Sequence, residues 1–233
     1  MVDDLTRFDE CQVEREDARI SREIYEAQRR ITPNGTDIKP FEIFGMVDAK
    51  VGNTGRYAGI VSMHTASEFG SRSPALFAAS LAALGGISRP VRCLDDVLRT
   101  EYVPGQTVGR TIQHIAEKLG ERVDLHEYCR LQSTARFSSF GSAISPDRQT
   151  VAILELRAAE EAPADFLMEH AGQLAFYLAT HHCKRRIDFD NLKISHRPDR
   201  TVTESVRDLS KTMFNEFAVG QMAWMTVKEC VKL

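Results

Sequence analysis

The sequence predicts an α+β fold built from two similar subdomains, in each of which helices cover one face of an antiparallel sheet. Three observations predict it. The 233 residues are 42% hydrophobic and 27% charged, as in an ordinary globular protein. Strand-like runs alternate with helix-spaced apolar residues along the chain. The order of strand pair, loop and helix then occurs twice, which predicts two units of one plan.

Charge and hydropathy exclude several classes of protein. There are 30 Lys and Arg against 33 Asp and Glu, so the net charge is −3 and direct binding of nucleic acid is not expected. The longest strongly apolar stretch, residues 76–87, is shorter than the roughly 20 residues that a membrane-spanning helix needs. The N-terminus is acidic and lacks the apolar core of a secretory signal.

The cysteines predict free thiols. Five of them are scattered without CxxC spacing, which favours buried, reduced side chains over a disulfide framework. They are Cys11, Cys93, Cys129, Cys183 and Cys230.

Residues 1–37 are predicted to form a charged helical arm. Residues 7–30 carry six basic and seven acidic side chains, and their apolar residues fall on one thin helical stripe. Such a helix is either a solvated surface element or a docking arm for a partner. The turn residues 33–36 end it. The apolar stripe consists of Val13, Ile20, Ile24 and Ala27.

The first core subdomain is predicted to span residues 38–132 and to begin with a β-hairpin. Residues 41–47 and 57–63 read as its strands, and Gly and Asn between 52 and 55 suit its turn. Ser73-Pro74 then opens a helix that Gly85-Gly86 ends.

A second helix of this subdomain is predicted to begin after Thr107 and to end at Gly120. Its apolar residues have the spacing of one buried face, and residues 122–132 follow as a strand. The buried face consists of Val108, Ile112, Ile115, Ala116 and Leu119.

The second core subdomain is predicted to span residues 133–233. Residues 135–143 and 150–157 read as strands, and Pro163 opens a helix with Leu167, Ala171, Leu174, Ala175 and Leu178 on its apolar side. Thr201 and Glu204 have the spacing of a capping box ahead of another helix. Residues 217–227 are apolar and β-prone, and are predicted to form the closing strand.

The two subdomains share landmarks. Arg56 and Arg148 precede equivalent strands, and Pro74 and Pro163 open equivalent helices at a similar spacing. This pattern is explained either by an ancient duplication or by coincidence in a common hairpin–helix layout.

No residue pattern predicts bond chemistry. The chain lacks a phosphate-binding glycine loop, a dinucleotide fingerprint and a nucleophile elbow. Residues 181–183, His-His-Cys, would point in different directions on a helix and so would not ligate one metal ion. Residues 184–186, Lys-Arg-Arg, read as a solvated helix end rather than an RNA contact. The chain is therefore not expected to be an enzyme, and no catalytic residue, metal or cofactor is expected.

One predicted loop has the composition of an interaction tip. Residues 67–73, between the first hairpin and its helix, place the aromatic Phe69 beside the carboxylate of Glu68. Either this ring contacts a partner protein, or it folds back onto the core.

In these features the chain resembles elongation factor Ts, the guanine-nucleotide exchange factor of the bacterial and organellar elongation GTPase. The similarity covers residues 42–229 in order. Residues 45–61 match the family's opening hairpin, and Ser67-Glu68-Phe69 stands where the family has Thr-Asp-Phe-Val. Residues 108–130 resemble its helix-to-strand turn, and residues 201–204 and 217–227 resemble its final helix and strand. The family's two core subdomains would also produce the repeated plan.

The chain departs from the family pattern in several places. The N-terminal ubiquitin-associated-like domain and the coiled-coil insertion have no evident counterpart. Gly70 replaces a valine of the tip motif, and residues 145–148 replace the His-Gly that precedes a strand of the second half. These changes are expected to preserve the core fold, which would be like the family's dimerisation domain.

The resemblance implies an exchange factor for an elongation factor Tu-type GTPase in protein biosynthesis. The partner-binding residues it implies are Ser67, Glu68, Phe69, Gly70 and Arg72. The alternative is an exchange-inactive relative that serves as a structural subunit of a large mitochondrial complex, a ribosome or a respiratory complex. The expected location is the mitochondrion, on the matrix side, with the cytoplasm as the alternative.

Overall fold

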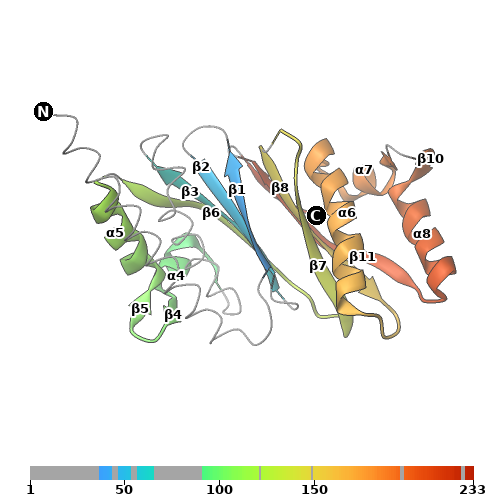
Figure 1. The fold of residues 1–233 in the computed structure, drawn as a ribbon, viewed down its shortest axis with the longest axis horizontal. Coiled ribbons are helices and arrows are strands. Elements are labelled where there is room, and N and C mark those ends of the chain that lie inside the picture. The colour runs from blue at the N-terminus through green and yellow to red at the C-terminus, as the bar shows by residue number, and fades with distance from the viewer. Residues whose placement is uncertain are drawn as a thin grey trace, which may run out of the picture. The chain divides into compact units, whose positions relative to one another are not determined.

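The computed structural model describes residues 37–43, 47–53, 57–65, 91–120, 122–147, 149–194, 197–226 and 229–233 (Figure 1). It confirms a mixed fold of helices and antiparallel sheets. The chain divides into two compact units, Met1–Thr54 with Val61–Tyr128, and Gly55–Ile60 with Cys129–Leu233. The predicted arm lies outside the described residues, except for its last residue, Asp37. The predicted helix that begins at Pro74 also lies outside them. The predicted boundaries at 37/38 and 132/133 remain predictions.

One four-stranded sheet has the order β1-β2-β3-β6. The prediction of a single strand over residues 41–47 is wrong, because β1 ends at Ile43 and pairs antiparallel with β2, which begins at Val47. The apolar run crosses the end of one strand and the start of the next, so its pattern does not show the reversal. The four strands are β1 Asp37–Ile43, β2 Val47–Asn53, β3 Tyr57–Thr65 and β6 Val123–Gln132.

Helix α5, Val108–Leu119, lies where the sequence predicts it. The Thr107 side chain accepts a hydrogen bond from the backbone N–H of Arg110, and Gly120 ends the helix in the left-handed conformation with φ 66°. Glycine adopts this conformation without the Cβ clash that other residues meet. Three short elements before α5 were not predicted: α4 Leu94–Arg99, β4 Glu101–Val103 and β5 Gln106–Thr107.

A second four-stranded sheet has the order β12-β11-β8-β7, and all of its strands are antiparallel. Strands β7 (Phe137–Ile144) and β8 (Thr150–Ala158) confirm the predicted pair. Strand β11, Phe217–Thr226, confirms the predicted strand, but it does not close the sheet. The short strand β12, Cys230–Lys232, adds an edge beside it.

Helix α6, Ala164–His181, packs closely on this sheet. The contact is backbone to backbone at Gly141 of β7: a Cβ there would lie 2.6 Å from the Met168 carbonyl oxygen and still closer to the backbone of Ala171 and Gly172. No side chain fits at that point, so Gly141 permits the approach of the helix.

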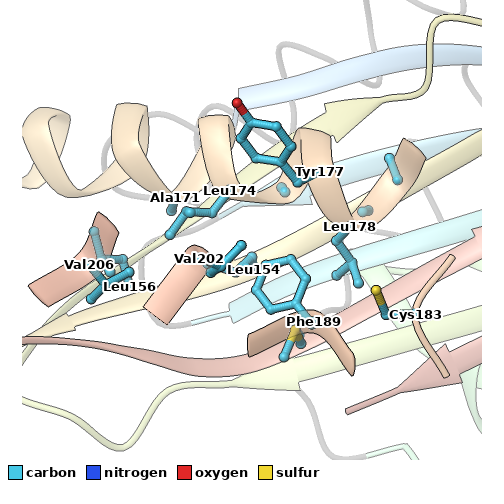
Figure 2. Packing of buried hydrophobic residues seen from close by; sticks show 14 of the residues in the cluster. Leu154, Leu156, Ala171, Leu174, Tyr177, Leu178, Cys183, Phe189, Val202 and Val206 are labelled. Atoms are coloured by element: carbon cyan, nitrogen blue, oxygen red, sulfur yellow. The ribbon is translucent and has the colours of Figure 1, made fainter. Parts of the chain in front are cut away.

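The core of this unit is formed by α6, by the short helix, ribbon and helix that follow it and by the sheet (Figure 2). Those elements are α7 Arg186–Asp190, the ribbon of β9 Lys193–Ile194 with β10 Arg197–Thr201, and α8 Val202–Met213. The core includes Leu154, Leu156, Ala171, Leu174, Leu178, Phe189, Val202, Val206 and Trp224.

Strand β11 contains a bulge that is held by charged side chains. Gly220 and Gln221 interrupt its register with β8 opposite Glu155, a fully buried carboxylate. The backbone N–H of Gln221 donates to Glu155 Oε2 at 2.9 Å, and Arg157 Nη2 donates to the same oxygen at 2.7 Å. Ser133 Oγ donates to Glu155 Oε1. Burial by itself would raise the pKa of Glu155, but the bonds from Arg157, Ser133 and Gln221 together lower it below its ordinary value.

Candidate interaction surface

The predicted tip residues Ser67, Glu68, Phe69, Gly70 and Arg72 lie outside the described residues. The surface with the features of a binding site in the described part of the chain is centred on helix α8. A groove lies on each side of this helix, and an exposed aromatic residue, Phe214, ends it.

The start of α8 is fixed by a complete capping box, as the sequence predicts. The Thr201 hydroxyl accepts from the backbone N–H of Glu204 at 3.2 Å, and Glu204 Oε2 accepts from the backbone N–H of Thr201 at 2.8 Å. Two otherwise unpaired backbone donors are thereby satisfied, so the helix has a defined first turn. Val202 and Val206 then bury one face of the helix in the core.

The other end of α8 is held by a hydrogen-bonded turn. Ser210 Oγ accepts from the backbone N–H of Phe217 at 2.9 Å. The Asn215 side chain bridges to the backbone of Glu160, accepting from its N–H at 3.1 Å and donating to its carbonyl at 3.2 Å. The Glu216 carbonyl accepts from the backbone N–H of Ala159 at 2.8 Å. These bonds join the turn to the end of β8.

Phe214 stands at the apex of this turn with 94% of its surface exposed. Its φ angle is 50°, in the left-handed region where a side chain costs roughly 1–2 kcal/mol. Because the ring is exposed, it does not gain the free energy that burial of a phenyl ring would supply. Strain without burial at a fixed surface position is typical of a functional residue.

The first groove, of about 890 Å³, runs along α8 on the side of α7 and β11. Apolar side chains form part of its lining, and charged side chains lie on both sides. The exposed cations Arg207 and Lys211 come from α8, whereas the exposed carboxylates Glu160 and Glu216 come from the segments that flank the sheet. The apolar lining includes Val202, Val206, Phe217, Ala218 and Val219.

Arg186 lies at this groove but already has partners. Its guanidinium donates to the carbonyls of Val219 and Gly220, both at 2.8 Å, and pairs with Asp190 at 2.9 Å. It therefore fastens α7 to the bulge of β11 and is a structural cation of the groove.

The second groove, of about 520 Å³, lies between α6 and α8. Leu174, Tyr177, Val206 and Leu209 line it, and Phe176, 41% exposed, lies at its opening. It carries fewer acidic and basic side chains than the first groove, namely His170 and Asp208. Arg200 pairs with Asp208.

Two residues of the His-His-Cys cluster at 181–183 have structural roles. His182 takes the left-handed conformation, φ 50°, at the end of α6; its ring stacks on Trp224 at 5.2 Å, and its Nε2 lies 2.6 Å from Thr150 Oγ1. Cys183 is buried, and burial raises the pKa of its thiol. Among the residues that the structure describes, no three His, Cys, Asp or Glu side chains converge as a metal site requires.

Each cation of the Lys-Arg-Arg run is in an ion pair. Lys184 pairs with Glu229 at 2.9 Å, and Arg185 pairs with Asp188 at 2.6 Å. Arg186 pairs with Asp190, as described above. The run leads from α6 into the start of α7, so it is not the predicted helix end, and its charges are balanced locally.

In the described ranges no helix is both long enough and apolar enough to cross a bilayer. Comparison with known proteins gives no family: neither a protein-family model nor a curated protein matches the sequence.

Sequence reasoning did not identify Phe214. Thr201 and Glu204 mark the start of α8, but its end has no glycine signal, because the residue in the left-handed position is phenylalanine. An apolar residue that follows a helix pattern is ordinarily placed in the core. The detectable signal was the pair Asn215-Glu216 directly after it, since polar turn residues separate the helix from the next strand.

Proposed function

We propose that the protein is an elongation factor Ts-like exchange factor that acts on an elongation factor Tu-type GTPase. The observation that carries the proposal is a repeated order of elements. Among the described residues each half contains, in the same order, a hairpin, a short helix, a two-stranded ribbon, a 12-residue helix and a 10-residue strand. The first series is β2-β3, α4, β4-β5, α5 and β6, with residues 66–90 outside the description; the second is β7-β8, α7, β9-β10, α8 and β11, with α6 between β8 and α7.

Details of the two series agree as well. A threonine caps both 12-residue helices, Thr107 for α5 and Thr201 for α8. The same number of residues separates the start of each helix from the start of the strand that follows it. In both sheets this last strand lies beside the second strand of the hairpin, in the orders β2-β3-β6 and β7-β8-β11. These agreements support a duplicated core, which the resemblance to elongation factor Ts implies.

Exchange requires no bond chemistry. A factor that binds the nucleotide-free GTPase more tightly than the nucleotide-bound form weakens the nucleotide by the same free energy. Nanomolar nucleotide binding corresponds to about −12 kcal/mol, and burial of one phenylalanine contributes roughly 1.5–3 kcal/mol. In this mechanism Phe69 acts as a wedge near the nucleotide site, with Glu68 beside it. Its burial supplies too little free energy for exchange, so the rest of the docking face must provide further contacts.

The test is GDP release from an elongation factor Tu-type GTPase that carries a fluorescent GDP. We expect wild type to accelerate release and Phe69→Ala to lose about tenfold or more of that acceleration, because the truncated side chain no longer fills its site. Phe176→Ala removes a partly exposed phenyl ring elsewhere in the chain and is the matched control, with release expected to match wild type. No acceleration by wild type would overturn the exchange function; equal rates for Phe69→Ala would remove only Phe69 from it.

A structural subunit of a large mitochondrial complex is the second candidate, and the exposed Phe214 favours it. An aromatic residue held in the turn after α8 suits a permanent contact outside the tip at residues 67–72. Sedimentation of a mitochondrial lysate distinguishes the two candidates. A subunit would migrate with the large particle in a fixed ratio, whereas an exchange factor would migrate with the GTPase or alone.

A further inference from the structure

Three helices of the described part of the chain, α5, α6 and α8, end at a residue in the left-handed conformation. The three residues differ in what offsets the cost of that conformation. Gly120 ends α5 and has no Cβ to clash. His182 ends α6, and its ring stacks on Trp224 and contacts Thr150. Phe214 ends α8 with φ 50° and is 94% exposed. The left-handed turn at Phe214 lets its own backbone N–H and that of Asn215 donate to the Ser210 carbonyl, as in other helix caps. The exposed ring adds nothing to that cap, so a phenylalanine in place of glycine points to a contact with another molecule.

The groove beside Phe214 has two sides of opposite charge. Arg207 and Lys211 are four residues apart and so lie on one face of α8. Glu160 and Glu216 are exposed and come from the segments that flank the sheet, and the apolar residues Val206 and Val219 belong to the same lining. An apolar strip with an acidic flank and a basic flank is the complement of an amphipathic helix whose own flanks carry the reverse charges.

We propose that this groove binds an amphipathic helix of a partner protein, and that Phe214 is its aromatic anchor. Acidic side chains of the helix lie against Arg207 and Lys211, its basic side chains lie against Glu160 and Glu216, and its apolar stripe covers the groove and the Phe214 ring. The turn needs no rearrangement for this, because Asn215, Ser210 and Glu216 already hold it. Such a preformed anchor loses little entropy on binding. The proposal does not depend on exchange activity.

The experiment uses a designed 18-residue helical peptide as the probe. It carries a leucine stripe, glutamate along one flank and lysine along the other, and a fluorescent label reports binding by anisotropy. We expect the full-length protein to bind it and Phe214→Gly to weaken binding at least about tenfold. Because glycine suits the left-handed position, Phe214→Gly is expected to raise the unfolding midpoint while it lowers affinity. A purely structural role for Phe214 would lower that midpoint instead.

Charge reversal tests the two flanks. Arg207→Glu with Lys211→Glu makes both sides of the groove acidic, so it is expected to weaken the mixed-charge probe about tenfold and to improve binding of a probe with lysine on both flanks. Phe176→Ala, at the second groove, is the matched control and is expected to bind the mixed-charge probe like wild type. Phe214→Asn provides a second variant that tolerates the left-handed conformation.

Three results would overturn the proposal. One is no binding of the probe by wild type at concentrations up to about 1 mM, the weak end of specific recognition. Another is equal binding by wild type and Phe214→Gly. The third is a dimer of this chain in sedimentation equilibrium that Phe214→Gly abolishes, because a second copy would then be the occupant. GDP release is measured on the same variants, and unchanged release with lost probe binding separates this site from the proposed exchange function.

Discussion

Gly141 shows how one missing side chain sets the distance between a helix and a sheet. We expect Gly141→Ala to cost about 3 kcal/mol, since the new methyl group meets the backbone of α6 and no side chain can move aside. Gly172, on the helix side of the same contact, has room for a Cβ, whose nearest neighbour would be the Ser142 carbonyl oxygen at 3.6 Å. Gly172→Ala is therefore expected to be neutral or to stabilise by up to about 1 kcal/mol. Urea unfolding measures both, and equal costs would contradict the close approach.

Glu155 is a charged side chain in the protein interior, and its contribution to stability depends on pH. Its folded pKa lies below the ordinary value of 4.5. Its contribution is therefore fully present above about pH 4.5 and is lost as the pH falls through the folded pKa. We expect Glu155→Gln to cost about 2 kcal/mol at neutral pH, because the bonds from Arg157 and Gln221 lose their charged acceptor.

The pH dependence separates this charge effect from a simple packing defect. The difference in unfolding free energy between wild type and Glu155→Gln should shrink as the pH falls below 4.5, where wild type also loses the charge. Glu169→Gln, at an exposed position on α6, is the control and should leave stability unchanged at all pH values. A difference that is constant from pH 7 to pH 3 would contradict this account.

Among the elements, helix α8 depends on its cap. The Thr201 hydroxyl accepts from the Glu204 N–H and also donates to Glu204 Oε2 at 3.1 Å. At the start of α5 the Thr107 hydroxyl accepts from the Arg110 N–H, its one bond to the described residues. We expect Thr201→Ala to cost about 1 kcal/mol and Thr107→Ala about 0.5 kcal/mol. Thermal or urea unfolding of the two variants gives the comparison. A larger cost for Thr107→Ala would show that the second bond of Thr201 adds nothing.

Long elements with terminal signals were the predictable part of this fold. Helices α5, α6 and α8 have apolar residues at helical spacing together with a Thr or Pro at the start, so the interior and the boundary signals agree. Strands β7 and β8 have alternating or continuous apolar runs with polar turn residues between them. In these segments local preference and tertiary packing favour the same structure.

Short elements and surface features were not predictable from the same patterns. Helix α7 has five residues and β12 has three, too few for a periodicity to show. The reversal between β1 and β2 lies inside one apolar run. Phe214 was missed because hydrophobicity predicts burial, whereas the exposure of this ring follows from the bonds that Asn215 makes to Glu160 across the fold. The candidate surface thus depends on tertiary contacts that no local pattern contains.

At the scale of the whole molecule, the repeated order of elements makes Gly120 and Phe214 equivalent positions. Both follow a 12-residue helix, both take the left-handed conformation, and both precede a 10-residue strand. One half of the chain has the residue that the backbone favours, and the other has a residue that it disfavours. A partner contact through Phe214 would explain why a residue that destabilises the fold occupies this position, as often happens at functional sites.

Exchanging the two residues tests this equivalence. We expect Phe214→Gly to stabilise the protein by about 1 kcal/mol and Gly120→Phe to destabilise it by about the same amount, because each change removes or adds the Cβ clash of the left-handed conformation. Neither position offers a close contact to compensate, since the Phe214 ring is exposed and a Cβ on Gly120 would meet no atom within 4 Å. The double variant should therefore unfold near the wild-type midpoint in urea. A destabilising effect of Phe214→Gly would mean that the ring supports its own fold, and the argument that a partner maintains it would fail with that result.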